Sequence, residues 1–166
     1  MPDLQWLDKY SGETVDDLIA LEGTYRIDSL VLAFEQAMDQ KAARVGEHKL
    51  TAEERIVLAI EALEREVNNG GYELFFANSS REYSPIIVEA LRRIGCPTTA
   101  EITLKAVDVV KQMPITPEES ENGTWMDKRE RSDALCECDS LYFERPENIE
   151  ECLFAFIKAN RSRIKP

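Results

Sequence analysis

The chain has 166 residues, with 32 acidic side chains, 20 basic ones and a single histidine, so its formal net charge is −12. Apolar residues make up 43% of the sequence, which excludes a disordered chain and suits one folded domain. This acidity excludes binding to nucleic acid or to an anionic membrane through general electrostatics. The sequence contains no apolar run long enough to span a bilayer and no signal peptide at its start, so we expect a cytoplasmic protein.

The first part of the chain shows the apolar spacing of two amphipathic helices. From residue 27 apolar side chains recur every three or four positions, and this stripe ends before Gly46. A second helix opens at Thr51-Ala52-Glu53-Glu54, a capping box in which the Thr hydroxyl and the Glu carboxylate satisfy each other's exposed amides. We expect these side chains to face the core: Ile27, Leu30, Val31, Phe34, Met38, Ile56, Ile60, Leu63 and Val67.

The most distinctive segment runs from residue 68 to residue 80 and joins two glycines to an aromatic cluster. Because glycine permits a left-handed turn, we expect the second helix to end at Gly70-Gly71. A short helix then follows, whose aromatic side chains fill the core. A ligand site is the alternative interpretation, since glycine amides and Asn78 can contact an anion. The motif consists of Asn68, Asn69, Gly70, Gly71, Tyr72, Phe75, Phe76 and Asn78.

Two more helices are expected before residue 114. Ser84-Pro85 predicts a start with Ser as the cap and Pro in the first turn, and Gly95 predicts the end. The sequence Thr98-Thr99-Ala100-Glu101 has the pattern of a second capping box, which opens a helix that Pro114 stops. We expect these side chains to face the core: Ile87, Leu91, Ile94, Ile102, Ala106, Val109 and Met113.

The remainder of the chain predicts an exposed loop and two helices. Residues 114–124 contain two prolines, a glycine and three glutamates, a composition typical of loops. Helices are expected from about residue 125 to 144 and from about 146 to 160. No strand pattern and no internal repeat is present. We therefore expect an all-α protein, a compact single-domain bundle of seven or eight helices over residues 1–166, with N-terminal helices at about 13–45 packed on a core of about 50–160.

Signatures of catalysis and of metal binding are missing from the sequence. It has no phosphate-binding glycine loop, no dinucleotide fingerprint and no nucleophile elbow, and its one histidine, His48, lies in a linker. Cys136 and Cys138 are closer than zinc-binding pairs usually are, and a fourth ligand beside Cys152 is missing. We expect a non-enzymatic protein with no catalytic residue, metal or cofactor. A bound metal or a deep acidic cleft would restore the weaker alternative of a carboxylate-pair enzyme.

The negative charge is unevenly distributed along the chain. Residues 114–152 carry −8, from twelve acids and four bases, whereas residues 153–166 carry +4. At 100° per residue, four of these acids lie within about 60° of each other on one side of the predicted helix, roughly 140° from its apolar side. We call Glu130, Asp133, Glu137 and Glu144 the acidic row, and we expect it to face outward, opposite Leu135, Cys138 and Tyr142.

The spacing of the acidic row is comparable to that of DNA phosphates. Fourteen residues of helix rise by about 21 Å, which spans about six phosphates of one DNA strand. Helical carboxylates at i,i+4 lie about 6 Å apart, close to the separation of neighbouring phosphates. The helix side that carries the acidic row could therefore occupy the basic groove of a DNA-binding protein. A solvated surface that only keeps the protein in solution is the alternative interpretation.

A family resemblance supports these expectations. The segment Leu63-Glu64-Arg65-Glu66-Val67-Asn68-Asn69-Gly70-Gly71-Tyr72, with the aromatic and Asn78-Ser79-Ser80 residues after it, resembles the core motif of a bacterial family of mostly uncharacterised helical domains. The segment from Ile86 to Ala100 is similar to that family as well. The resemblance covers residues 50–113 well and extends loosely to about 160, and Leu74 replaces an expected glutamine. It implies an all-helical fold. One family member is a DNA mimic, a dimer that keeps a helix-turn-helix transcription factor off DNA.

Together, the charge pattern and the resemblance predict an acidic protein that mimics the DNA phosphate backbone. We expect it to bind a basic, DNA-binding protein and to act in transcription regulation, without binding nucleic acid or membrane, and the resemblance implies a homodimer. The alternative is a protein- or ligand-binding module centred on residues 68–80, with acidity serving only solubility. Besides the acidic row, the expected flanking contacts are Glu118, Glu119, Glu121, Glu147, Glu150 and Glu151.

Overall fold

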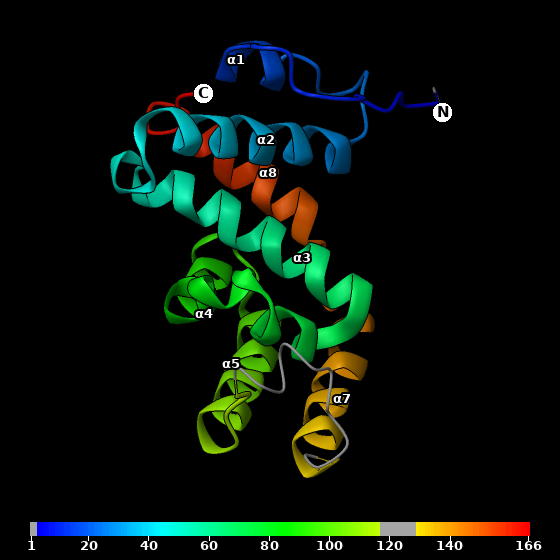
Figure 1. Ribbon diagram of the computed structural model, residues 1–166. Helices are drawn as coiled ribbons and strands as arrows, with labels where there is room; N and C mark the ends of the chain where they lie inside the picture. Colours follow the sequence, from blue (N-terminus) through cyan, green and yellow to red (C-terminus); the bar gives the residue numbers. More distant parts are fainter. Residues whose placement is uncertain (1–2, 117–128) are drawn as a thin grey trace. The chain divides into compact units, whose positions relative to one another are not determined.

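The computed structural model describes residues 3–116 and 129–166, and over these ranges the protein is all-α (Figure 1). The described residues form seven α-helices and two short 3₁₀ helices, and their only extended pairings are isolated bridges at Tyr25. The all-α prediction is therefore confirmed. None of the described helices combines the length and the apolar character that crossing a membrane requires.

The chain divides into two compact units, residues 1–61 with 148–166 and residues 62–147. Helix α3 contributes residues to both units. The first unit contains α1 (Val15–Ile19), α2 (Ile27–Val45), the 3₁₀ helix Glu47–Lys49, the start of α3 (Ala52–Ala77) and α8 (Ile149–Ala159). The second contains the rest of α3, the 3₁₀ helix Ser79–Tyr83, α4 (Ser84–Arg93), α5 (Pro97–Gln112) and α7 (Arg129–Phe143).

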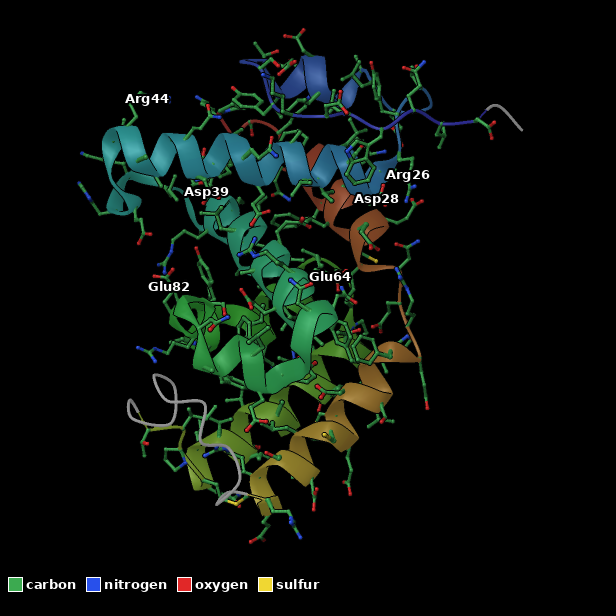
Figure 2. The ribbon with its side chains drawn as sticks, turned by 45° about the vertical axis from the view of Figure 1, so that its right-hand side comes forward. Arg26, Asp28, Asp39, Arg44, Glu64 and Glu82 are labelled. Carbon is green, nitrogen blue, oxygen red and sulfur yellow. The ribbon has the colours of Figure 1, made fainter. Side chains whose placement is uncertain are left out.

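In the first unit α2 packs against α8. The apolar stripe of α2 forms the core as expected, and only Ile27 at its start is half-buried. From α8 the side chains of Leu153 and Ile157 are fully buried. At the start of α2, Arg26 forms an ion pair with Asp28 and lies over the ring of Trp6 (Figure 2).

The Thr51 capping box is confirmed and is part of a larger polar cluster. The Thr51 amide donates to Glu54 Oε2 at 2.9 Å, and the Glu54 amide donates to Thr51 Oγ1 at 3.1 Å. Glu54 is fully buried, and its other oxygen accepts from Lys41 Nζ at 2.7 Å and from the Lys165 amide at 2.8 Å. Because each carboxylate oxygen has donors, the buried charge is compensated. The end of the chain is thereby attached to the first unit.

In the second unit α5 packs against both α4 and α7 (Figure 1). Helix α4 ends as predicted, with Gly95 in left-handed backbone at φ +91°. The predicted Ser84 cap is wrong: Ser84 is the first helical residue, and no side chain caps the helix. The chain enters α4 directly from a 3₁₀ helix, so Tyr83 lacks the extended backbone that a capping residue needs. Among the expected core residues of α5, Val109 and Met113 are only half-buried.

Candidate functional site

The glycine motif interrupts helix α3 at the predicted place. Gly70 and Gly71 have non-helical backbone angles, and Gly71 has a φ of +79°, which glycine adopts without strain. The residues from Tyr72 to Ala77 then resume the helix, as expected. The first amide of this resumed segment needs an acceptor, because no preceding helical turn supplies one.

Asp139 of α7 supplies that acceptor. The Tyr72 amide donates to Asp139 Oδ1 at 2.7 Å, and a Cβ atom on Gly71 would overlap the Asp139 carboxylate. Partial burial of Asp139 raises its pKa, and the nearby Glu73 charge adds to this, while the hydrogen bond from Tyr72 opposes it. Asp139 is not among the site residues predicted from the sequence. Helical periodicity could have indicated its position, because it places Asp139 opposite Glu130 and therefore on the inner side of α7.

Tyr72 and Phe75 of the motif belong to the core. Tyr72 and Phe75 are fully buried, and Tyr72 Oη lies 2.7 Å from Thr103 Oγ1. Burial raises the pKa of Tyr72 well above its ordinary value. Asn68 Nδ2 donates to the Glu64 carbonyl at 2.6 Å, and Asn78 Nδ2 donates to Glu66 Oε2 at 2.9 Å. The Tyr72 amide and the side chains of Asn68 and Asn78 are thus engaged within the second unit, and the anion beside the glycines is the protein's own Asp139.

A second carboxylate, Glu147, caps helix α5. Its Oε1 accepts from the Thr98 amide at 2.7 Å, and its Oε2 accepts from the Thr99 amide at 2.9 Å and from Thr99 Oγ1 at 2.6 Å. The predicted capping box at Thr98 is therefore wrong. Helix α5 begins at Pro97, so Thr98 lies inside the first turn and cannot be the cap.

The electrostatics of Glu147 agree with this structural role. Partial burial would raise its pKa, but hydrogen bonds from Thr99 and Thr98 outweigh that effect and lower it. Glu147 was expected to be a flanking partner contact, a prediction that stays untested, and both of its oxygens accept hydrogen bonds from the first turn of α5.

The inner side of α7 makes further polar contacts. Arg131 is fully buried, and its Nη1 donates to the Pro114 carbonyl at 3.0 Å, while its Nη2 lies 3.5 Å from Glu73 Oε1. Tyr142 Oη donates to the carboxylate of Glu64, which Figure 2 labels on α3. With the apolar contacts of Leu135 and Cys138, these bonds fix the rotation of α7 about its own axis.

Glu130, Asp133 and Glu137 of the acidic row lie on the opposite side of α7, as predicted, whereas Glu144 lies in the turn directly after the helix, which ends at Phe143. The four carboxylate side chains of the row are exposed, and none of them has a hydrogen bond or ion pair with another residue in the described part of the chain. Leu135, Cys138 and Tyr142 are buried on the other side. Of the expected flanking contacts, Glu150 and Glu151 lie in the first turn of α8, in the first unit, and Glu118, Glu119 and Glu121 lie outside the described residues.

An apolar groove of about 620 Å³ lies along α4 and α5 in the second unit. Phe76, Val88 and Leu104 form part of its wall, and Arg92 and Lys111 lie at its rim. The four cysteines of the chain are free thiols, of which only Cys136 is exposed. The described residues contain no group of three or more side chains that could hold a metal ion.

Comparison with known proteins identifies the family. A family model described as DMP19-like protein matches residues 48–160, a range that includes both the Asn-Asn-Gly-Gly motif and the acidic row. No curated protein and no solved structure matches the chain. The family match covers about two thirds of the sequence, and the resemblance seen in the motif is thereby confirmed. The chain belongs to the DMP19-like protein family.

Proposed function

We propose that the protein is a non-enzymatic DNA mimic, which binds a basic, DNA-binding protein through the acidic row of α7. The family name refers to DNA mimic protein 19. The observation that carries the proposal is the row itself, in which Glu130, Asp133 and Glu137 lie on one side of α7 and Glu144 lies in the turn directly after it. All four carboxylates are exposed and make no hydrogen bond or ion pair within the described residues. Carboxylates without internal partners are available to cations of another protein.

The attachment of α7 supports a role in recognition. Buried Leu135, Arg131 and Tyr142 hold the helix on its inner side, so the carboxylates of the row project from a backbone whose orientation is fixed. A fixed array loses less conformational entropy on binding than a mobile acidic segment would. The row extends over about 21 Å, which suits a groove that normally holds a stretch of phosphates.

Net charge determines the class of partner. Residues 62–147, the second unit, contain seventeen acids and ten bases, a formal charge of −7. Long-range repulsion therefore opposes DNA, RNA and anionic lipid, and attraction favours a basic protein. The alternative module at residues 68–80 has less support, because the amide of Tyr72 and the side chains of Asn68 and Asn78 are already hydrogen-bonded.

A pair of variants with equal charge tests the proposal. The row variant carries E130Q, D133N, E137Q and E144Q. The control variant neutralises four other exposed acids that have no partner in the described part of the chain, with D3N, D8N, E47Q and E82Q. Glu82, labelled in Figure 2, lies in the 3₁₀ helix before α4 and not on α7. Each variant changes the net charge from −12 to −8, so any difference between them reports position rather than total charge.

The measurement is retention of proteins from a host lysate on the immobilised chain, with elution in a salt gradient. We expect wild type and control to retain a DNA-binding protein that the row variant binds roughly tenfold to hundredfold more weakly. The retained protein, once purified, should lose its DNA band shift when wild-type chain is added. Retention of no DNA-binding protein at low salt contradicts the proposal, and so does equal loss in both variants. We also propose the homodimer that the family resemblance implies, and sedimentation velocity tests it.

A further inference from the structure

Two exposed apolar side chains lie at the C-terminal end of α7, beside the acidic row. Leu141 is 37% exposed and Phe143 is 51% exposed. The other large apolar side chains that are exposed in the described residues, Leu4, Trp6 and Val45, belong to the first unit. Within the described part of the second unit, the large apolar side chains that are exposed therefore both belong to the helix that carries the row.

Helical geometry places these two side chains on either side of the row. At 100° per residue, Leu141 lies about 20° beyond Glu130 on one side, and Phe143 lies about 80° beyond Asp133 on the other. Leu141 is four residues after Glu137, so it is adjacent to that carboxylate on the helix surface, and it lies three residues before Glu144 in the following turn. Leu141 therefore borders the C-terminal end of the row, and Phe143 lies further round the helix beyond its other edge.

We propose that Leu141 and Phe143 insert into apolar pockets of the same basic protein that the acidic row binds. This inference rests on the proposed function and adds an apolar component to it. Proteins that read DNA combine cations for phosphates with apolar side chains that contact the thymine methyl group. The carboxylates then take the place of phosphates, and the two apolar side chains take the place of base methyl groups.

Charge complementarity selects this occupant over the others. A membrane or a nucleic acid would bring its own anions against Glu137 and Glu144, and a second copy of this face would oppose one carboxylate row to another. A cationic protein surface neutralises the row and covers the apolar pair at the same time. Apolar contacts at the centre of an interface give specificity that a row of charges does not, since burial requires complementary shape.

Salt dependence separates the two components experimentally. The apolar variant carries L141S and F143S, and its control carries L4S and V45S, two side chains of similar exposure in the first unit. The probe is the DNA-binding protein that wild type retains from lysate, and its affinity is measured at a series of salt concentrations. We expect the apolar variant to bind roughly tenfold to hundredfold more weakly at every salt concentration, with the slope of log affinity against log salt unchanged. The row variant should instead flatten that slope.

Each outcome has a distinct meaning. If the row variant is impaired and the apolar variant binds as wild type does, this inference is wrong and the proposed function stands. If the control L4S/V45S loses as much affinity as the apolar variant, the loss reflects non-specific hydrophobic association, and the inference is also wrong. If wild type retains no DNA-binding protein, both proposals fail. Far-ultraviolet circular dichroism of each variant checks that the helices are intact.

Two chromatographic supports provide a test that needs no natural partner. One carries a quaternary ammonium group alone, and the other carries the same cation with a benzyl group attached. We expect wild type to elute from the benzyl support at a higher salt concentration than the apolar variant, and the two to coincide on the plain support. If wild type and the apolar variant elute at the same salt concentration from both supports, the inference is overturned. The apolar pair would then not contact a group next to a bound cation.

Discussion

The two sides of helix α7 carry the same kinds of charged residue with opposite consequences. On the inner side, Asp139 accepts the Tyr72 amide, and Arg131 is fully buried against Pro114 and Glu73. On the outer side, the four carboxylates of the acidic row are exposed and have no partner in the described part of the chain. The difference shows that the side of the helix on which an acid lies determines whether its carboxylate is bonded within the fold or left in water, which the number of acids does not reveal.

Position also determines what each carboxylate does to folding stability. On the inner side, one or two hydrogen-bond donors of the protein replace the water around the carboxylate. Removing the carboxylate therefore leaves backbone amides without an acceptor. An outer carboxylate stays in water and loses little when it is neutralised. We therefore expect substitutions on and around the two sides to differ in unfolding free energy, from a large loss at the glycine motif to almost none on the acidic row.

Substitution G71A should be the most damaging single change. It forces an L residue into a φ of +79° and places a Cβ against the Asp139 carboxylate, so the hydrogen bond to Tyr72 is lost as well. We expect a loss of roughly 2–4 kcal/mol of unfolding free energy. The matched control is G95A in the same unit, where φ is +91° and an added Cβ would meet no atom within 4 Å. This substitution should lower the unfolding free energy by only about 1 kcal/mol. Urea unfolding measures both, and equal losses would contradict the close approach of Asp139.

Two substitutions at Asp139 should differ from each other. D139A removes the acceptor of the Tyr72 amide and should cost about 1–2 kcal/mol at neutral pH. D139N keeps an oxygen acceptor without a charge to desolvate, so it should be at least as stable as wild type at neutral pH. Because burial raises the pKa of Asp139, its favourable contribution is complete below its ordinary pKa of 3.8 and is lost as the pH rises through the folded-state pKa. The unfolding free energy of wild type should therefore rise relative to that of D139N as the pH falls. Urea titrations across that pH range measure the difference.

Glu147 should show the opposite pH dependence. Its pKa is lowered, so the stability that it contributes is present above its ordinary pKa of 4.5 and is lost as the pH falls through the folded-state value. E147A should cost about 1 kcal/mol at neutral pH, the usual value for a helix cap, and less in acid. The control E144A removes a nearby exposed carboxylate of the row and should have little effect at either pH. A pH-independent loss in E147A would contradict its capping role.

Neutralising Asp133 should have the smallest effect, within about 0.5 kcal/mol, and should be slightly stabilising. Asp133 and Glu137 repel each other at i,i+4, and D133N removes that repulsion without breaking a hydrogen bond among the described residues. Thermal unfolding followed by circular dichroism measures the change. A loss above about 1 kcal/mol would show that the outer side of α7 supports the fold, which would remove the contrast between its two sides.

Local sequence patterns predicted only part of the capping. The Thr51 box was predicted correctly, because its two partners, Thr51 and Glu54, lie in one turn and find each other wherever the helix forms. The Thr98 box has the same pattern and is wrong, because Glu147 approaches from 48 residues further along the chain and takes the amides of Thr98 and Thr99. No pattern within four residues contains that information.

The candidate site divides in the same way. Helical periodicity was sufficient to predict that the acidic row faces outward, because Leu135, Cys138 and Tyr142 must be buried on the other side. The pairing of Asp139 with the glycine motif joins residues 67 positions apart, and periodicity shows only that Asp139 lies on the inner side. The role of the row in binding remains the proposal that the variants above test.

The sequence by itself determined the all-α class, the break at Gly70-Gly71, the outward face of the acidic row and the resemblance to the family. These follow from interactions within a few turns of helix or from a motif that is continuous in the chain. Only the tertiary structure decided which acids are structural, since Asp139 and Glu147 cap segments far away in sequence. A carboxylate's role depends on which donors the fold brings to it, and that requires the packing of distant segments.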